Sequence, residues 1–136
     1  MADSPQIAVY SFAESGALIV GGTSGVGLAT AIRFAKAGVR AVGIVGRNAE
    51  RGETARQAIV AAAPGANVHF IQGDANVLEQ AQRVTIEAKA KLGSLDILVN
   101  CTMDMSRYTP EPLVNLPPEV IGPTMLSVVL APMHMS

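Results

Sequence analysis

Three glycines lie close together in a short polar turn, and their spacing is suited to holding a phosphate anion. Gly21, Gly25 and Gly27 follow the pattern Gly-x-x-x-Gly-x-Gly. A tight turn needs residues that tolerate positive φ, and a diphosphate can approach the main chain only where no Cβ intervenes. Thr23 and Ser24 lie within the turn and add hydroxyl groups that can donate to phosphate oxygens. The turn is therefore a candidate site for a dinucleotide.

The position of this turn between two expected elements favours a binding role. An apolar run at residues 17–20 predicts a buried strand before it, and residues 24–36 predict a helix after it. The start of that helix would present free N–H groups and the positive end of its dipole to an anion. The alternative is that the glycines only make a tight turn and allow close helix packing. The strand–turn–helix context favours binding over that alternative.

Arg47 is the second feature with a chemical consequence, because it follows the expected second strand at residues 39–45. Dinucleotide-binding folds that prefer NAD place an acidic residue at the end of this strand, on the ribose 2′-hydroxyl. Here Gly46 replaces the acid, and the Arg47 guanidinium can pair with a 2′-phosphate through two parallel hydrogen bonds. The sequence therefore predicts NADP(H) rather than NAD(H). The alternative is that Arg47 is only a solvated residue at a helix start.

The elements expected to position these residues alternate along the chain. Further strands are predicted at residues 68–71 and 95–100, and further helices at residues 49–62, with Asn48 as the N-cap, and 77–92. This alternation predicts βαβ units and a parallel sheet. Since crossovers are right-handed, we expect the strand order 3-2-1-4. The predicted fold class is α/β, a Rossmann-like doubly wound parallel sheet, present as an incomplete half-domain.

The expected helix at residues 77–92 has one apolar face and one charged face. The face expected to be buried carries apolar residues at helical spacing, namely Val77, Ala81, Val84 and Ala88. A different face carries alternating charges four residues apart, namely Glu79, Arg83, Glu87 and Lys91. We interpret the charged face as a solvated surface and not as a binding site.

The glycine pattern resembles the cofactor motif of the short-chain dehydrogenase/reductase family, Thr-Gly-x-x-x-Gly-x-Gly, with Val20 where that family usually has Thr. The resemblance implies that Asp74 and the backbone of Ala75 meet the adenine ring. Asp74 could instead cap the following helix, or do both.

Asn100 matches the first Asn of the family segment Leu-Val-Asn-Asn-Ala-Gly, which stabilises the central sheet near the cofactor. Cys101 and the two residues after it depart from that segment, which loses its glycine. The predicted cofactor-binding residues are Gly21, Thr23, Ser24, Gly25, Val26, Gly27, Arg47, Asn48, Asp74, Ala75 and Asn100.

The same resemblance implies an NADP(H)-dependent oxidoreductase that transfers hydride to or from a small carbonyl or alcohol substrate. It also implies a catalytic Tyr with a Lys four residues later. Tyr10 is followed at that spacing by Glu14 and Tyr108 by Pro112, so we assign no catalytic residue. Two other functions stay open, a catalytically inactive NADP(H)-binding module and a half-domain completed by a partner chain.

Three parts of the chain are expected. Residues 1–16 are interpreted as an N-terminal arm, and residues 17–103 as the Rossmann dinucleotide-binding region. Residues 104–136, which are rich in proline, are interpreted as a loop and partial helix that lead to a catalytic half beyond this chain. The expected fourth strand would otherwise be an unpaired edge, which folded proteins usually cover.

Composition excludes several classes of function. With a net charge of −1 and 4% aromatic residues, the chain lacks the charge and stacking pattern of a nucleic-acid-binding protein. No apolar run predicts a membrane span, and the N-terminus does not resemble a signal peptide. The single Cys101 and two histidines predict neither a disulfide framework nor a metal site, and they fit a reducing, cytoplasmic setting. Because 49% of residues are apolar and only 15% charged, we expect surface that is buried against missing chain or a partner subunit. The expected assembly is a homo-oligomer.

Overall fold

The computed structural model describes residues 11–102 together with residues 115, 119 and 133. In these residues a parallel sheet has the strand order β3-β2-β1-β4, which confirms the predicted topology. The loop and helix expected within residues 104–136 lie outside the described residues, apart from those three positions. In chain order the elements are η1 (Phe12–Glu14), β1 (Gly16–Val20), α1 (Gly25–Lys36), β2 (Ala41–Gly46), α2 (Ala49–Ala62), β3 (Val68–Gln72), α3 (Leu78–Leu92) and β4 (Ile97–Asn100).

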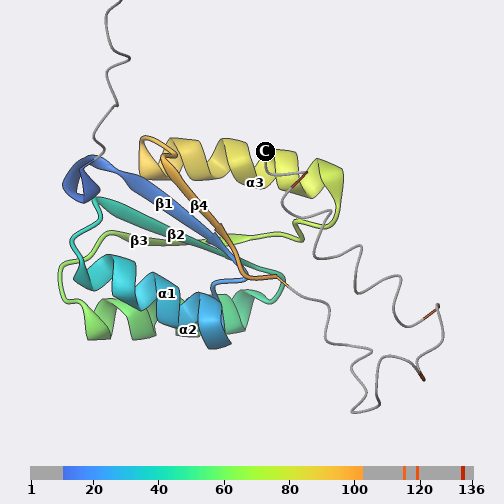
Figure 1. Ribbon diagram of the computed structural model, residues 1–136, viewed down its shortest axis with the longest axis horizontal. Coiled ribbons are helices and arrows are strands. Elements are labelled where there is room, and N and C mark those ends of the chain that lie inside the picture. Colours follow the sequence, from blue (N-terminus) through green and yellow to red (C-terminus); the bar gives the residue numbers. More distant parts are fainter. Residues whose placement is uncertain (1–10, 103–114, 116–118, 120–132, 134–136) are drawn as a thin grey trace, which may run out of the picture.

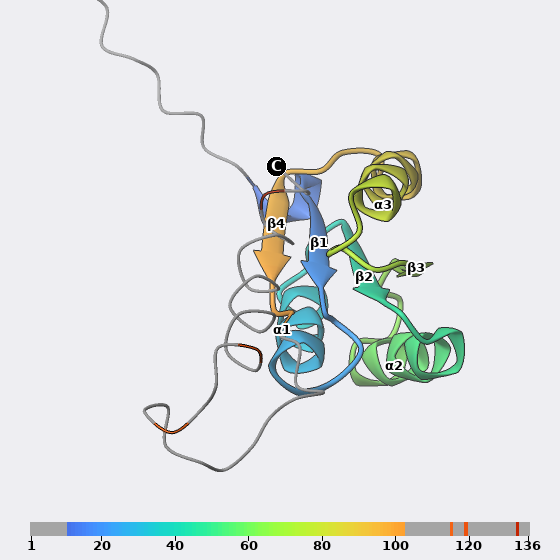
Figure 2. The same cartoon turned by 90° about the vertical axis from the view of Figure 1, so that its right-hand side faces the viewer.

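Helices cover both faces of the sheet. α1 and α2 lie side by side on one face, and α3 lies on the other (Figures 1 and 2). β1 is buried along its whole length, as continuous apolar strands in two-sided parallel sheets are. Its side chains divide between two cores, Leu18 and Val20 toward α3 and Ala17 and Ile19 toward α1 and α2. The fold is therefore a three-layer sandwich with β1 at its centre.

Several element boundaries differ from the prediction by one or two residues. α1 begins at Gly25 and not at residue 24, because Ser24 has extended backbone and serves as the N-cap. β2 begins at Ala41 because Val39 still belongs to the end of α1, where its N–H donates to the Phe34 carbonyl at 3.2 Å. This bond accompanies Gly38 at φ +81° and forms a Schellman cap. β4 begins at Ile97 and not at residue 95.

The two faces of α3 largely follow the prediction. Ala81, Val84 and Ala88 are buried, and Leu92 continues that face. Val77 is the exception, with 38% of its surface exposed, because the helix starts at Leu78 and Val77 precedes its first turn as the N-cap. The charged face carries two ion pairs, from Glu87 to Arg83 at 3.2 Å and to Lys91 at 2.8 Å.

Arg40 ties several segments together at the end of the sheet opposite to the glycine-rich turn. Its guanidinium donates to the Leu92 carbonyl at 2.6 Å, to the Glu14 carbonyl at 3.0 Å and to Ser94 Oγ at 2.6 Å. Asp96 extends this cluster, since its carboxylate accepts the Gly16 amide at 2.8 Å and the Ser94 hydroxyl. Residues 11–15 pack at the same end, where the Phe12 ring meets Phe34 edge-on with centroids 6.0 Å apart.

We expect Arg40→Ala to lower the free energy of unfolding by about 2 kcal/mol, because three hydrogen bonds are lost and the carbonyl at the end of α3 loses its donor. Urea unfolding followed by circular dichroism measures the change. Arg33→Ala removes an exposed arginine from α1 and should change stability by no more than about 0.5 kcal/mol. Equal effects of the two substitutions would show that the Arg40 contacts do not stabilise the fold.

Asp96 gives this end of the sheet a pH dependence. The hydrogen bonds from Ser94 and from the Gly16 amide hold the pKa of the Asp96 carboxyl below its ordinary value. A depressed carboxyl pKa contributes stability above the unfolded-state pKa, and that stability is lost as pH falls through the folded-state pKa. We therefore expect Asp96→Asn to flatten the decline in melting temperature below about pH 4, where carboxyls titrate. An unchanged decline in the variant would show that other groups cause it.

Candidate functional site

The glycine-rich turn leaves the carboxyl end of β1 and passes over the end of β2. The amides of Gly21 and Gly22 both donate to the Val45 carbonyl, at 3.0 and 3.2 Å. Gly21 has φ +76°, and a Cβ there would lie 2.9 Å from the carbonyl of Cys101, the residue that follows β4. The turn is thus fixed between the ends of β2 and β4, where it leads into α1 (Figure 2).

The three glycines of the motif have different reasons to be glycine. A Cβ at Gly27 would collide with the Gly21 carbonyl, so Gly27 allows α1 to pack directly on the turn. Gly21 is likewise required by close contact with Cys101. Gly25 differs, since it has φ +53° and a Cβ there would meet nothing within 4 Å. Packing therefore accounts for two of the glycines, and the third borders open space.

That open space lies in front of the N-terminus of α1. The first hydrogen bond of the helix joins the Leu28 amide to the Ser24 carbonyl at 3.1 Å, and the amides before Leu28 have no acceptor within the helix. The Ser24 side chain makes no capping hydrogen bond, and Val26 beside it is 76% exposed. Uncapped N–H groups at the positive end of a helix dipole attract anions. The arrangement can hold phosphate oxygens.

At the end of β2 the structure separates the roles of Arg47 and Asn48. Asn48 is the N-cap of α2, as predicted, and its Oδ1 accepts the Arg51 amide at 2.8 Å. The Arg47 carbonyl accepts Gln72 Nε2 at 3.1 Å, while its side chain is exposed. Within residues 11–102 the Arg47 guanidinium has no carboxylate within ion-pair distance. It is therefore available to an anionic ligand.

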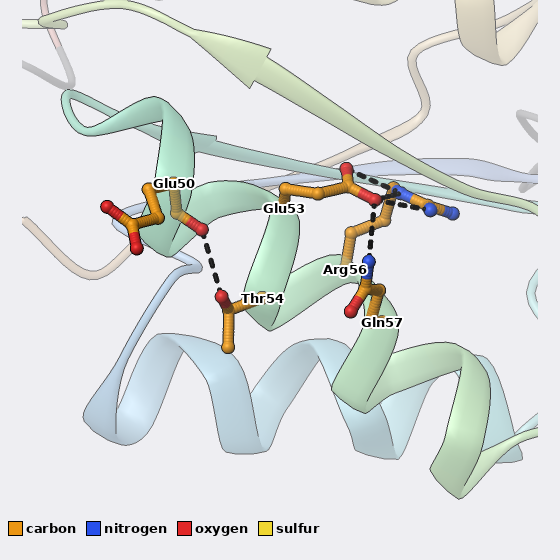
Figure 3. A network of polar contacts seen from close by, with 5 residues as sticks. All are labelled: Glu50, Glu53, Thr54, Arg56 and Gln57. Atoms are coloured by element: carbon orange, nitrogen blue, oxygen red, sulfur yellow. Dashed lines mark hydrogen bonds and ion pairs between the residues drawn. The ribbon is translucent and has the colours of Figure 1, made fainter.

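Arg56, further along α2, shows the opposite situation. Glu53 accepts its guanidinium at 2.6 and 2.9 Å, and Gln57 donates to the same carboxylate at 3.2 Å (Figure 3). The Arg56 guanidinium lowers the pKa of the Glu53 carboxyl through these bonds. The Thr54 hydroxyl donates to the Glu50 carbonyl one turn back at 3.0 Å. The Arg56 guanidinium is therefore paired within α2. Unlike Arg47, it is not available to an anionic ligand at the edge of the site.

Asp74 follows β3 at the same edge of the sheet but does not cap α3. Its Oδ1 accepts the Asn76 amide at 2.9 Å, and its own amide donates to Gln80 Oε1 at 2.8 Å. The Val77 amide donates to the Asp74 carbonyl at 3.1 Å, and Val77 is the N-cap. The alternative role of Asp74 as a cap is therefore wrong, because its carboxylate closes a turn that precedes the helix. Ala75 is 3% exposed beside it.

Asn100 ends β4 directly beside the end of β1. Val20 and Asn100 are register partners, and the Cys101 amide donates to the Val20 carbonyl at 2.8 Å. The Asn100 Oδ1 accepts the Thr102 hydroxyl at 2.8 Å, so Thr102 fixes the Asn100 side chain. The family motif marks Thr102 only as a departure from its pattern. A hydroxyl two residues after an amide side chain is the signal in the sequence that could have shown this role.

The carboxyl ends of all four strands therefore bring the predicted residues to one edge. The turn after β1 lies between the ends of β2 and β4, and the segments after β2 and β3 are joined by the Gly73 amide, which donates to the Gly46 carbonyl at 3.0 Å. Open parallel sheets bind ligands at this edge, where the strand order reverses. Here the reversal falls between β1 and β4, next to the glycine-rich turn.

Cys101 and His69 do not form a reactive pair. They belong to the segment after β4 and to β3, at opposite edges of the sheet. Burial lowers the pKa of the His69 imidazole, which lies half-buried in β3. Among the residues that the structure describes, no group of His, Cys, Asp and Glu is arranged to hold a metal ion.

Comparison with known proteins identifies the family. A model of the short chain dehydrogenase family matches residues 15–121, which is more than half of the chain. The chain belongs to the short-chain dehydrogenase family. A probable galactose dehydrogenase of Rhizobium meliloti is 42% identical over 87 residues, which are 64% of this chain and 33% of that protein.

The chain is similar to solved structures that hold NADPH. An NADPH-bound short chain oxidoreductase from Pseudomonas aeruginosa, described as containing an atypical catalytic center, matches with a TM-score of 0.80 and 26% identity. The match covers 93% of this chain and 48% of that structure. L-Sorbose reductase from Gluconobacter frateurii, complexed with NADPH and L-sorbose, matches with a TM-score of 0.74 and 26% identity over 89% of this chain and 44% of that structure.

These matches cover most of this chain but less than half of each matched protein. The chain spans about a third of the curated relative and less than half of each solved structure. The matched part includes the sheet and the glycine-rich turn, since the family model begins at residue 15. None of the helices in the described part of the chain is both long and apolar enough to cross a bilayer.

Proposed function

We propose that this chain binds NADP(H) at the carboxyl edge of its sheet, as the cofactor-binding part of an oxidoreductase. The observation that carries the proposal is the open space at Gly25, in front of the uncapped start of α1, together with the exposed guanidinium of Arg47, which has no ion-pair partner within residues 11–102. A diphosphate fits such a cradle because the main chain there lacks a Cβ and offers N–H groups. The NADPH-bound relatives support the same cofactor.

Different residues are proposed to bind different parts of the cofactor. The amides of Gly25, Val26 and Gly27 bind the diphosphate, together with the hydroxyl groups of the turn. Arg47 binds the ribose 2′-phosphate through charge-assisted hydrogen bonds, next to the backbone of Asn48. The remaining predicted residues, at the adenine and nicotinamide ends, are Asp74, Ala75 and Asn100.

When bound, the nicotinamide ring supplies or accepts the hydride, and the chain contributes binding and orientation. The hydrogen bond between Thr102 and Asn100 orients the Asn100 side chain at the end of β4, next to the end of β1. We propose a small carbonyl or alcohol as the substrate, a homo-oligomer as the assembly and the cytoplasm as the location. Residues 17–103 are the proposed binding region.

Calorimetric titration of the folded chain tests the proposal. We expect NADPH to bind about tenfold or more tightly than NADH in the same buffer, because only NADPH carries the phosphate that pairs with Arg47. Equal dissociation constants would contradict the preference for NADP(H). The absence of heat with either nucleotide, from protein with a cooperative unfolding transition, would overturn the proposed function itself.

A second candidate function is binding without hydride transfer. It is favoured by the residues four positions after each tyrosine, Glu14 after Tyr10 and Pro112 after Tyr108, since neither is the lysine of a Tyr-x-x-x-Lys pair. Incubation with NADPH and a panel of aldehydes and ketones distinguishes the two functions by absorbance of the reduced nicotinamide. Turnover would exclude the second function, and tight binding without turnover would favour it for this chain.

A further inference from the structure

Gly46 and Thr23 face each other between the end of β2 and the glycine-rich turn. A Cβ at Gly46 would lie 2.5 Å from Thr23 Cγ2, 3.1 Å from its Oγ1 and 3.4 Å from its Cβ. Nonbonded carbon atoms pack at about 3.5–4.0 Å, so the first of these contacts is far too short. The Thr23 side chain therefore occupies the space that the Cβ of any side chain at position 46 would need.

The path of the main chain creates this contact. Alternate residues of a strand point to the same face, so position 46 faces the same side as Ile44. Ile44 already lies under the turn, because a Cβ at Gly22 would be 2.7 Å from its Cγ2. Since the amides of Gly21 and Gly22 are bonded to the Val45 carbonyl, the turn cannot lift away without losing both bonds.

Rotation of the Thr23 side chain offers little relief. Threonine is branched at Cβ, and both of its γ atoms lie within 3.1 Å of the place that a Cβ on residue 46 would take. Turning χ1 exchanges one γ atom for the other, and no staggered rotamer turns both away, because only one of the three staggered positions on the Thr23 Cβ points away from residue 46. Alanine at position 23 would remove both atoms and leave a contact of 3.4 Å, which is ordinary packing.

We propose that Thr23 restricts position 46 to glycine, so that no acidic ribose ligand can stand at the end of β2, and thereby supports specificity for NADP(H). This inference rests on the proposed binding of NADP(H). An acidic side chain at the end of this strand is the device by which related folds bind the ribose hydroxyls of NAD. Selectivity then has two separate parts. Arg47 attracts the 2′-phosphate of NADP(H), and Thr23 leaves no room for a carboxylate side chain at position 46.

The steric part is tested without any cofactor. Gly46→Ala should lower the melting temperature by roughly 3–6 °C, as overpacking does in a domain of this size. Adding Thr23→Ala should restore most of the loss, whereas adding Ser24→Ala, in the same turn but not among the atoms nearest to position 46, should restore none. A wild-type melting temperature for Gly46→Ala would overturn the proposal. So would a double variant that stays as unstable as Gly46→Ala, or that fails to fold.

The specificity part is tested by titrating the full chain with NADH. Gly46→Asp should gain little affinity, and Gly46→Asp combined with Thr23→Ala should bind NADH about tenfold more tightly than the single variant. Equal NADH affinity of the single and double variants would overturn the role of Thr23. Failure of the wild-type chain to bind NADPH would instead refute the proposed function, and the melting experiment would still report on the contact.

Discussion

Gly25→Ala is expected to weaken NADPH binding about 30-fold or more while leaving the fold intact. The new methyl group would enter the open space in front of α1, where the diphosphate is proposed to lie. Losing one or two charge-assisted hydrogen bonds there corresponds to about 2 kcal/mol. Because Gly25 has φ +53°, alanine also costs about 1–2 kcal/mol of stability through backbone strain. Calorimetry measures the first effect and thermal unfolding the second.

Gly38→Ala is the matched control for this prediction. Gly38 has φ +81° and equally open surroundings, but it ends α1 at the other end of the helix. The strain should therefore be similar, and the affinity for NADPH should not change. Similar losses of affinity in both variants would attribute the effect of Gly25→Ala to the backbone. Unchanged affinity in both would remove Gly25 from the site.

The order of elements could be predicted from the sequence because each local pattern has one dominant cause. The apolar run of β1 can be buried on both sides only in a covered parallel sheet, and Asn48 is a strong N-cap directly before α2. The exact boundaries could not be predicted in the same way, because they depend on bonds that composition does not reveal. Valine is a residue type that favours strands, but the amide of Val39 closes the Schellman cap of α1.

The sequence predicts which residues lie at the candidate site more completely than it predicts the role of each one. The glycine spacing identifies the turn, but only the packing of the turn against Cys101 and α1 separates Gly21 and Gly27 from Gly25. The sequence allows two roles for Asp74, and the start of α3 at Leu78 removes the capping role. The contact between Thr23 and position 46 joins residues 23 positions apart, and no local pattern reports it.

Arg47→Asp is expected to reverse the preference from NADPH to NADH. Removing the guanidinium costs a bidentate, charge-assisted pair, which corresponds to a loss of NADPH affinity of about 30-fold or more. The new carboxylate repels the 2′-phosphate and can accept a hydrogen bond from the ribose hydroxyl of NADH. Dissociation constants for both nucleotides, measured at one ionic strength, give the ratio. Arg33→Asp makes the same change of charge in the last turn of α1 and should leave the ratio unchanged.

The contrast with Gly46→Asp makes this reversal informative. The Arg47 side chain is exposed, so a carboxylate at position 47 does not need the space that Thr23 fills. One substitution at position 47 should therefore succeed where one substitution at position 46 fails, although the two positions are adjacent. If Arg47→Asp lost NADPH without gaining NADH, the ribose hydroxyl would lie out of reach of the shorter aspartate side chain. If it lost neither, the guanidinium would be only a solvated group at the start of α2.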